Sequence, residues 1–162
     1  MKHALSVPKM DEKDIERFWA RVDKSGGCWE WRGGFTEKGY GKLYLGGRQV
    51  RAHRISYRLA KGDFDPALVV DHICRNHACV NPDHLRAVTE KQNGEHREAT
   101  SERSNSGYRG VVWRVVEQKW RVQVKHAGRF HWGGYHTELS DAIAAARALR
   151  LGLFSHNDLD RV

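Results

Sequence analysis

The sequence predicts an α+β fold of two small units, each built from short antiparallel strands and helices. Short runs rich in Val, Tyr and Trp alternate with glycine turns, which is typical of such strands. Apolar residues recur at helical spacing in several other segments. Three cysteines and nearby histidines offer ligands for a structural zinc ion, which would stabilise the small core of the first unit.

The composition favours a soluble protein that binds a polyanion. The chain has 162 residues and a net charge of +8, which suits nucleic acid phosphates, although solubility alone is the ordinary alternative. An odd number of cysteines favours a reducing compartment over a disulfide framework. The N-terminus has no signal-peptide core, and no apolar run approaches the ~20 residues of a membrane helix. We expect a cytoplasmic protein without a membrane partner.

The first unit is expected over residues 1–98, with a loose tail at residues 1–10. An apolar stripe with helical spacing predicts a helix over residues 11–22. The stripe consists of Ile15, Phe18, Trp19 and Val22. Three strands, a helix, a buried strand and a second helix should follow, because turn residues separate them and Thr89 begins a capping box. Their ranges are 28–33, 40–45, 48–52, 53–62, 67–73 and 89–99.

A polar linker and a second unit complete the chain. Residues 99–107 are small and polar, which predicts the linker, and the second unit then covers residues 108–162. Three antiparallel strands and one helix are expected in it, with Ser140 capping the helix and Gly152 ending it. The strand ranges are 111–116, 119–126 and 130–135.

The candidate catalytic residues lie at the end of the buried strand and the start of the following helix. Asp71 and Asn93 carry oxygen ligands for a hard divalent ion, and His72 could activate a water molecule against phosphorus. Asp-His alone is also an ordinary turn dipeptide, so the pair gains meaning from the segment around it.

That segment, VVDHICRNHACVNPDHLRAVTEKQN, resembles the active-site segment of the HNH, or ββα-metal, nucleases, especially their phage homing endonuclease branch. The resemblance extends over about residues 14–98 through GCWEWRG, KGYGKLYL and AHRISY. It implies a DNA endonuclease that uses Mg²⁺ or Mn²⁺, in a phage-infected bacterial host. By this resemblance Asp71 and Asn93 bind the catalytic ion and His72 is the general base.

The roles of four further residues follow less directly from the resemblance. Asn93 stands where many relatives have His, so His96, one helical turn later, is an alternative ligand. Asn81 would orient the loop rather than take part in the chemistry. Arg54 is either a phosphate clamp or a surface arginine of its helix.

A separate structural zinc site is predicted beside the catalytic pair. Cys74, Cys79 and His84 have the spacing C-x4-C-x4-H, and Cys28 completes a closed set of three sulfurs and one nitrogen. His77 could replace His84, and buried free thiols are the alternative to a metal site. Such a zinc site would tie the first strand region to the active-site loop.

The second unit has the pattern of a DNA-reading sheet. In KWRVQVKH, Trp120, Val122 and Val124 alternate with polar residues, so one face can pack on the helix and the other can lie in a DNA groove. A solvated sheet face is the ordinary alternative. The segments SGYRGVVWR, KWRVQV and WGGYHT resemble the Apetala-type, or ethylene-response-factor, DNA-binding domain over about residues 106–153. The residues implied to contact DNA are Arg109, Arg114, Arg121, Gln123, Lys125 and Arg129, with Trp113 or Trp132 packing on sugars.

Together the two resemblances imply a sequence-directed, homing-type endonuclease with double-stranded DNA as its substrate. One HNH site cuts one strand, so a double-strand break would need a homodimer or two sequential events. A DNA-binding regulator without catalysis and a nuclease selective for junctions or flaps are the alternatives.

Overall fold

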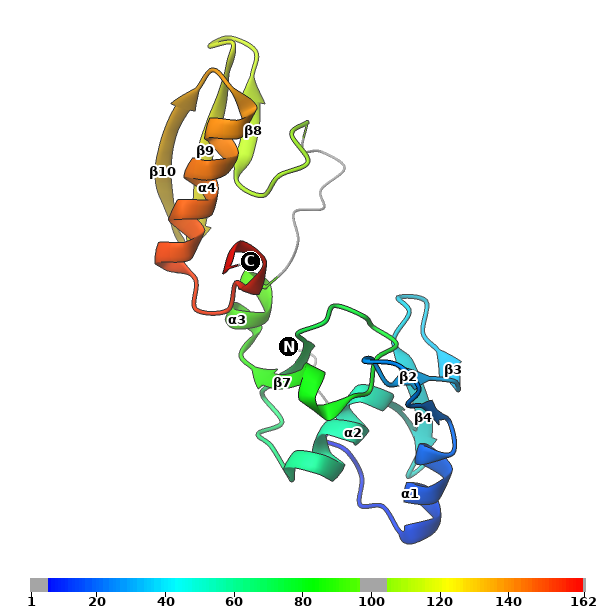
Figure 1. Cartoon of the computed structure of the whole chain (residues 1–162). Helices are drawn as coiled ribbons and strands as arrows, with labels where there is room; N and C mark the ends of the chain where they lie inside the picture. The colour runs from blue at the N-terminus through cyan, green and yellow to red at the C-terminus, as the bar shows by residue number, and fades with distance from the viewer. Residues whose placement is uncertain (1–5, 97–104, 162) are drawn as a thin grey trace. The chain divides into compact units, whose positions relative to one another are not determined.

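The structure is a computed structural model that describes residues 6–96 and 105–161. It divides into two compact units, Met1–Glu90 and Lys91–Val162. Both are mixed α and β with small antiparallel sheets, as the sequence predicts (Figure 1). Residues 99–104 of the predicted linker lie outside the described residues, so the predicted domain limits stay a prediction. None of the helices in the described ranges has the length and hydropathy to span a bilayer.

The first unit begins with a helix and a short hairpin. Helix α1 (Glu12–Trp19) is capped by Asp11, whose side chain accepts a hydrogen bond from the backbone N–H of Asp14 at 2.8 Å. The predicted helix to residue 22 is wrong at its C-terminal end. Val22 instead pairs with Trp31 across the ladder between β1 (Val22–Asp23) and β2 (Glu30–Trp31).

The middle of the first unit is a three-stranded antiparallel sheet followed by a helix. Strands β3 (Gly34–Phe35), β4 (Gly41–Leu45) and β5 (Arg48–Arg51) lie in that order, and α2 (Ala52–Lys61) follows at once. A Cβ atom on Gly41 would lie 2.7 Å from the indole of Trp31, so only glycine allows this close packing. The buried core consists of Val7, Phe18, Trp31, Leu43, Leu45, Val50, Ala52, Ile55 and Val80.

A second hairpin completes the first unit. Strand β6 (Val69–His72) pairs antiparallel with β7 (Leu85–Val88), and the 3-10 turn η1 (Pro82–His84) leads into β7. In the predicted loose tail, residues 1–5 lie outside the described residues. Val7 is buried, and its carbonyl accepts a hydrogen bond from Arg58 at 2.7 Å, which fixes this part of the chain to the core.

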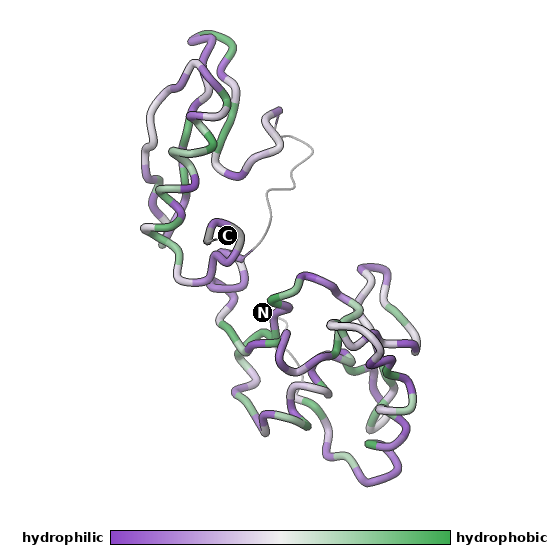
Figure 2. The backbone as a smooth tube through the Cα atoms, viewed as in Figure 1, coloured by the Kyte–Doolittle hydropathy of each residue, from purple (hydrophilic) through white to green (hydrophobic). Residues whose placement is uncertain are grey.

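The second unit contains the expected three-stranded sheet and helix. Strands β8 (Val111–Arg114), β9 (Lys119–His126) and β10 (Arg129–His136) form an antiparallel sheet in the order β10-β9-β8, and α4 (Leu139–Leu153) packs on it (Figure 1). The short helix α3 (Glu90–Glu95) precedes the sheet, and η2 (Asp158–Arg161) follows α4. The core consists of Val111, Val122, Ala142 and Ala146, and hydrophobic stretches occur in both units (Figure 2).

Both predicted limits of α4 are wrong by a residue or two. The N-cap is Glu138 rather than Ser140, and Leu139 packs on the core as the first helical residue. Gly152 does not end the helix, because the N–H of Phe154 still bonds to the carbonyl of Arg150 at 2.8 Å.

Candidate functional site

Asp71 and His72 lie at the end of β6 and face opposite sides of the hairpin. His72 is buried, at 4% exposure, and the side chain of Asp71 is 11% exposed. Asp71 is opposite Arg86 in the ladder, and its Oδ2 lies 3.2 Å from Nε of that arginine. The strand therefore places the carboxylate and the imidazole at consecutive positions but on opposite faces, with the carboxylate paired to Arg86.

The imidazole of His72 is held in one tautomer. Nε2 lies 3.0 Å from the carbonyl oxygen of Cys79. A carbonyl only accepts, so Nε2 carries the proton and Nδ1 keeps its lone pair. Burial lowers the pKa of His72 to about 4, although the bond to Cys79 opposes this shift. At neutral pH the ring is therefore uncharged and able to take up a proton at Nδ1.

Other aromatic rings surround His72. The centroid of the His53 ring lies 4.5 Å from that of His72 in an edge arrangement, and Tyr40 stacks on His77 at 4.0 Å. His53 is buried, and its Nδ1 has no hydrogen-bond partner in the described part of the chain. Burial holds the pKa of His53 well below its usual value. His53 was not identified from the sequence as a residue of the site. Its position between Ala52 and Ile55, on the apolar side of α2, could have indicated that it is buried.

Arg54, the next residue of α2, is also buried rather than exposed on the surface of its helix. It is 7% exposed, and its Nη1 donates to the carbonyl of Leu68 at 3.2 Å, just before β6. The guanidinium lies over the ring of Phe64, 4.8 Å from its centroid. Nε and Nη2 have no hydrogen-bond partner among the described residues. Burial without a paired anion lowers the pKa of Arg54.

The predicted zinc ligands lie together. One ligand atom each from Cys28, Cys74, Cys79 and His84 falls within 4.8 Å of all the others. Nδ1 of His84 is 3.6 Å from the sulfur of Cys28 and 3.6 Å from that of Cys79. Tetrahedral zinc with its usual bond lengths separates a sulfur and a nitrogen ligand by about 3.6 Å. The four residues therefore fit a structural zinc ion.

Without a cation, burial favours the neutral thiols of the cluster over the thiolates. Burial raises the pKa of the Cys79 thiol to about 12 and raises that of Cys74 as well. A divalent ion would supply the positive charge that stabilises thiolates at such a position. His77, the alternative fourth ligand, lies elsewhere, with its Nδ1 3.0 Å from the carbonyl of Lys38.

Asn81 holds the loop between two of these ligands. Its Nδ2 donates to the carbonyl of Gly27 at 3.0 Å, and its Oδ1 accepts from the N–H of Asp83 at 3.1 Å. The first bond connects the loop to the turn that carries Cys28, and the second caps η1. These contacts agree with an orienting role.

Comparison with known proteins identifies the domain that contains this geometry. Residues 50–95 match the family model described as HNH endonuclease. Protein 2.8 of Escherichia phage T7 is 37% identical over 103 residues, which cover 62% of this chain and 68% of the phage protein. The chain belongs to the family of protein 2.8 and contains an HNH endonuclease domain.

The chain is also similar to a second protein of phage T7. Protein 7.7 of phage T7 is 43% identical over 68 residues, which cover 42% of this chain and 52% of that protein. No solved structure matches the chain. The HNH domain includes Asp71, His72 and all the predicted zinc ligands except Cys28.

The HNH match ends on α3, most of which belongs to the second compact unit. Asn93 lies in the middle of α3 and is half-buried. His96 is buried, and its Nε2 lies 3.5 Å from Oδ2 of Asp158 in the same unit. The binding of a catalytic ion by Asn93 or His96 stays a prediction.

One face of the C-terminal sheet combines basic and aromatic side chains. In the register of β9 and β10, Phe130 is opposite Lys125 and Trp132 is opposite Gln123. Lys125 Nζ lies 5.5 Å from the centroid of Phe130. Val122 and Val124 point to the other face, into the core under α4 or close to it, which agrees with the predicted alternation. We name this outer surface the basic-aromatic face; it consists of Arg114, Arg121, Gln123, Lys125, Phe130, Trp132 and Tyr135.

Other residues predicted to contact DNA lie away from this face. Trp113 is on the helix side of the sheet, edge-on to Trp120 at 4.9 Å. Arg109 donates from Nη1 to the carbonyl of Glu95 at 2.8 Å and lies over the ring of Phe154. Arg129 is exposed at the start of β10.

Proposed function

We propose that this protein is a metal-dependent DNA endonuclease that hydrolyses phosphodiester bonds at sites selected by its C-terminal unit. The observation that carries the proposal is the state of His72 within the HNH domain. It is neutral, is fixed through Nε2 and directly follows Asp71 in the chain. A general base in a nuclease needs these properties.

In this proposal each residue has a separate role. His72 takes a proton at Nδ1 from the attacking water. Asp71 and Asn93, or His96 in place of Asn93, hold the Mg²⁺ or Mn²⁺ ion through ligands suited to hard cations. When bound, this ion supplies Lewis-acid stabilisation of the charge on the phosphate. Arg54 acts as a phosphate clamp, which its buried and incompletely paired guanidinium supports.

The zinc ion and the C-terminal unit have supporting roles. The Cys28, Cys74, Cys79 and His84 cluster binds a closed structural zinc and has no part in the chemistry. The basic-aromatic face binds duplex DNA, because cationic side chains attract phosphates and aromatic rings pack on sugars. The likeness of this unit to the Apetala-type domain supports sequence-directed, homing-type cleavage in the cytoplasm of a phage-infected cell.

The decisive experiment is incubation of supercoiled plasmid with the purified full-length protein, with and without Mg²⁺ or Mn²⁺. We expect open-circular product only when a divalent ion is present, and mapped ends that cluster at particular sequences. Linear product at high protein concentration would indicate that a homodimer, or two sequential events, cuts both strands. DNA binding without cleavage under all ions would favour a non-catalytic regulator. Cleavage confined to junction or flap substrates would favour a structure-selective nuclease.

A further inference from the structure

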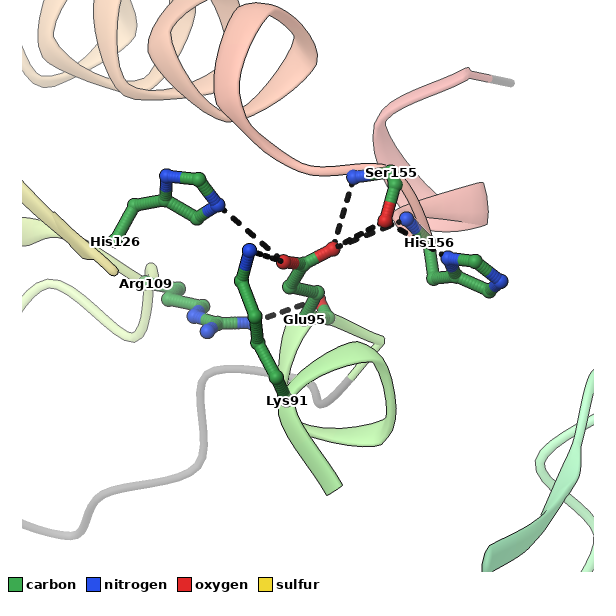
Figure 3. Close-up of polar contacts among 6 residues, drawn as sticks. All are labelled: Lys91, Glu95, Arg109, His126, Ser155 and His156. Carbon is green, nitrogen blue, oxygen red and sulfur yellow. Dashed lines mark hydrogen bonds and ion pairs between the residues drawn. The ribbon is translucent and has the colours of Figure 1, made fainter. Parts of the chain in front are cut away.

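The last residue of the HNH match, Glu95, has its carboxylate bound within the C-terminal unit. Oε2 accepts hydrogen bonds from the backbone N–H of Ser155 at 2.8 Å, from its hydroxyl at 3.0 Å and from the N–H of His156 at 3.2 Å (Figure 3). Ser155 and His156 follow the end of α4. The helix of the HNH segment is thereby connected to the far end of the chain.

The other carboxylate oxygen of Glu95 faces two basic side chains, one from β9 and one from α3 itself. Oε1 lies 3.5 Å from Nε2 of His126 on β9 and 3.7 Å from Nζ of Lys91 (Figure 3). The backbone carbonyl of Glu95 accepts from Nη1 of Arg109, which precedes β8. Figure 3 shows these side chains converging on Glu95 from several directions.

The helix that carries Glu95 has only six residues. Burial of a carboxylate is strongly unfavourable unless hydrogen bonds and cations compensate for the lost water, and Glu95 is only 4% exposed. The next residue, His96, is buried as well and faces Asp158 of the same C-terminal segment. Two consecutive residues therefore fix the end of α3 to residues 155–158, although a short helix has little stability of its own.

We propose that Glu95 is a positioning residue of the nuclease, through which the C-terminal unit fixes helix α3 and with it the backbone that carries Asn93, the proposed ligand of the catalytic ion. The inference rests on the proposed function, in which Asn93 is a ligand two residues before Glu95. The C-terminal unit then contributes to metal binding as well as to DNA recognition. Arg109 and His126 serve this attachment rather than DNA contact.

The test compares Glu95→Gln with Glu90→Gln, an exposed glutamate of the same helix. In single-turnover nicking by the full-length protein, Glu95→Gln should raise the Mn²⁺ concentration for half-maximal rate by about tenfold or more, as loss of residues that orient metal ligands does. The affinity for the plasmid, measured in EDTA, should stay within about twofold of the wild-type value, which is a small change in binding free energy. Glu90→Gln should match the wild type in both measurements.

A second readout does not depend on cleavage. Amide hydrogen exchange of residues 90–96 should be faster in Glu95→Gln than in Glu90→Gln. If Glu95→Gln does not fold, Ser155→Ala removes one donor and should produce a smaller shift in the same direction. Val122→Ala, which weakens the core of the same unit, separates positioning from general stability, because it should leave the Mn²⁺ requirement unchanged.

Three outcomes are decisive. Equal Mn²⁺ requirements and equal exchange in the two glutamate variants would overturn the inference while leaving the nuclease intact. An equal shift in Val122→Ala would assign Glu95 to stability alone and would also overturn it. A wild-type protein that does not nick DNA with any divalent ion would instead reject the proposed function, and the inference with it.

Discussion

Cys79 connects the zinc cluster to His72 through two of its own atoms. Its sulfur lies 3.6 Å from Nδ1 of His84, and its carbonyl oxygen lies 3.0 Å from Nε2 of His72. The backbone of a predicted zinc ligand therefore sets the tautomer of the proposed base. Removal of the structural ion should affect the chemistry, although the ion is not part of it.

We therefore expect about one tightly held zinc per chain, as in other closed cysteine-histidine sites. Removal with a chelator, followed by excess Mg²⁺, should reduce the nicking rate and lower the thermal midpoint, because the Cys79 carbonyl is no longer fixed. Elemental analysis and calorimetry measure the two effects. Protein prepared without chelator that contains no zinc, or that nicks equally well after chelation, would contradict this expectation.

His72→Ala should abolish the proton transfer without removing DNA binding. The nicking rate should fall by about 10²- to 10⁴-fold, the usual contribution of a general base. DNA affinity, measured by gel shift in EDTA, should change little because His72 is buried. His131→Ala, a half-buried histidine of β10, is the control and should retain the rate. Comparable rates for the two variants would reject His72 as the base.

The double variant Arg121→Ala/Lys125→Ala should weaken DNA binding through the loss of phosphate contacts. If each cation neutralises one phosphate, the slope of log K against log salt should decrease by about 0.9 per residue. Filter binding over a salt series measures this slope. Lys13→Ala, an exposed lysine of α1, should leave the slope unchanged. An unchanged slope in the double variant would remove the basic-aromatic face from the DNA interface.

Gly133→Ala should destabilise the C-terminal unit. An added Cβ would lie 2.4 Å from Cγ1 of Val122 and 2.9 Å from Cδ1 of Leu149, at the bulge in β10. Overpacking of this kind costs about 1–3 kcal/mol of unfolding free energy. Gly152→Ala on α4 meets no atom within 4 Å and should be neutral or stabilising by up to about 1 kcal/mol. Urea unfolding compares the two, and an equal effect would exclude the packing argument.

The buried pair Arg150–Asp160 should make stability depend on pH. Two bonds of 2.6 and 2.8 Å join the groups, and although burial opposes it, the guanidinium together with Asn157 holds the pKa of Asp160 below its usual value. The carboxylate therefore contributes stability that is fully present above its unfolded pKa of about 3.9 and is lost progressively as the pH falls from there through its lowered folded pKa. Asp160→Asn should cost about 3 kcal/mol at pH 7 and less at pH 3, where part of this contribution is lost. Asp141→Asn, at an exposed site, is the control. Urea unfolding at both pH values measures the free-energy difference between each variant and the wild type. A difference for Asp160→Asn that is as large at pH 3 as at pH 7 would contradict the prediction.

Local patterns predicted the strands and the metal cluster well. The alternation in KWRVQVKH gives the observed faces of β9, and the spacing of Cys74, Cys79 and His84 gives a closed ligand set with Cys28. Local patterns gave a wrong prediction where contacts between distant residues determine the secondary structure. Val22 satisfies a helical stripe but pairs with Trp31 instead.

The sequence also could not predict which contacts individual side chains make. Arg109 and Trp113 belong to a segment rich in basic and aromatic residues, yet the first bonds to Glu95 and the second packs on Trp120. Whether a side chain faces solvent depends on strand register, which a single sequence does not fix for β8. The contact between the rings of His53 and His72 likewise depends on the packing of α2 near β6, which the sequence alone does not give.

The four zinc donors are far from evenly spaced along the chain. Cys28 belongs to the first hairpin region, whereas Cys74, Cys79 and His84 follow within eleven residues of one another. A ribosome releases these donors in order, so the early hairpin would lack the predicted zinc crosslink until the loop containing His84 has emerged. Nascent chains that stop before that point should carry a reactive, unligated Cys28 and no assembled nuclease.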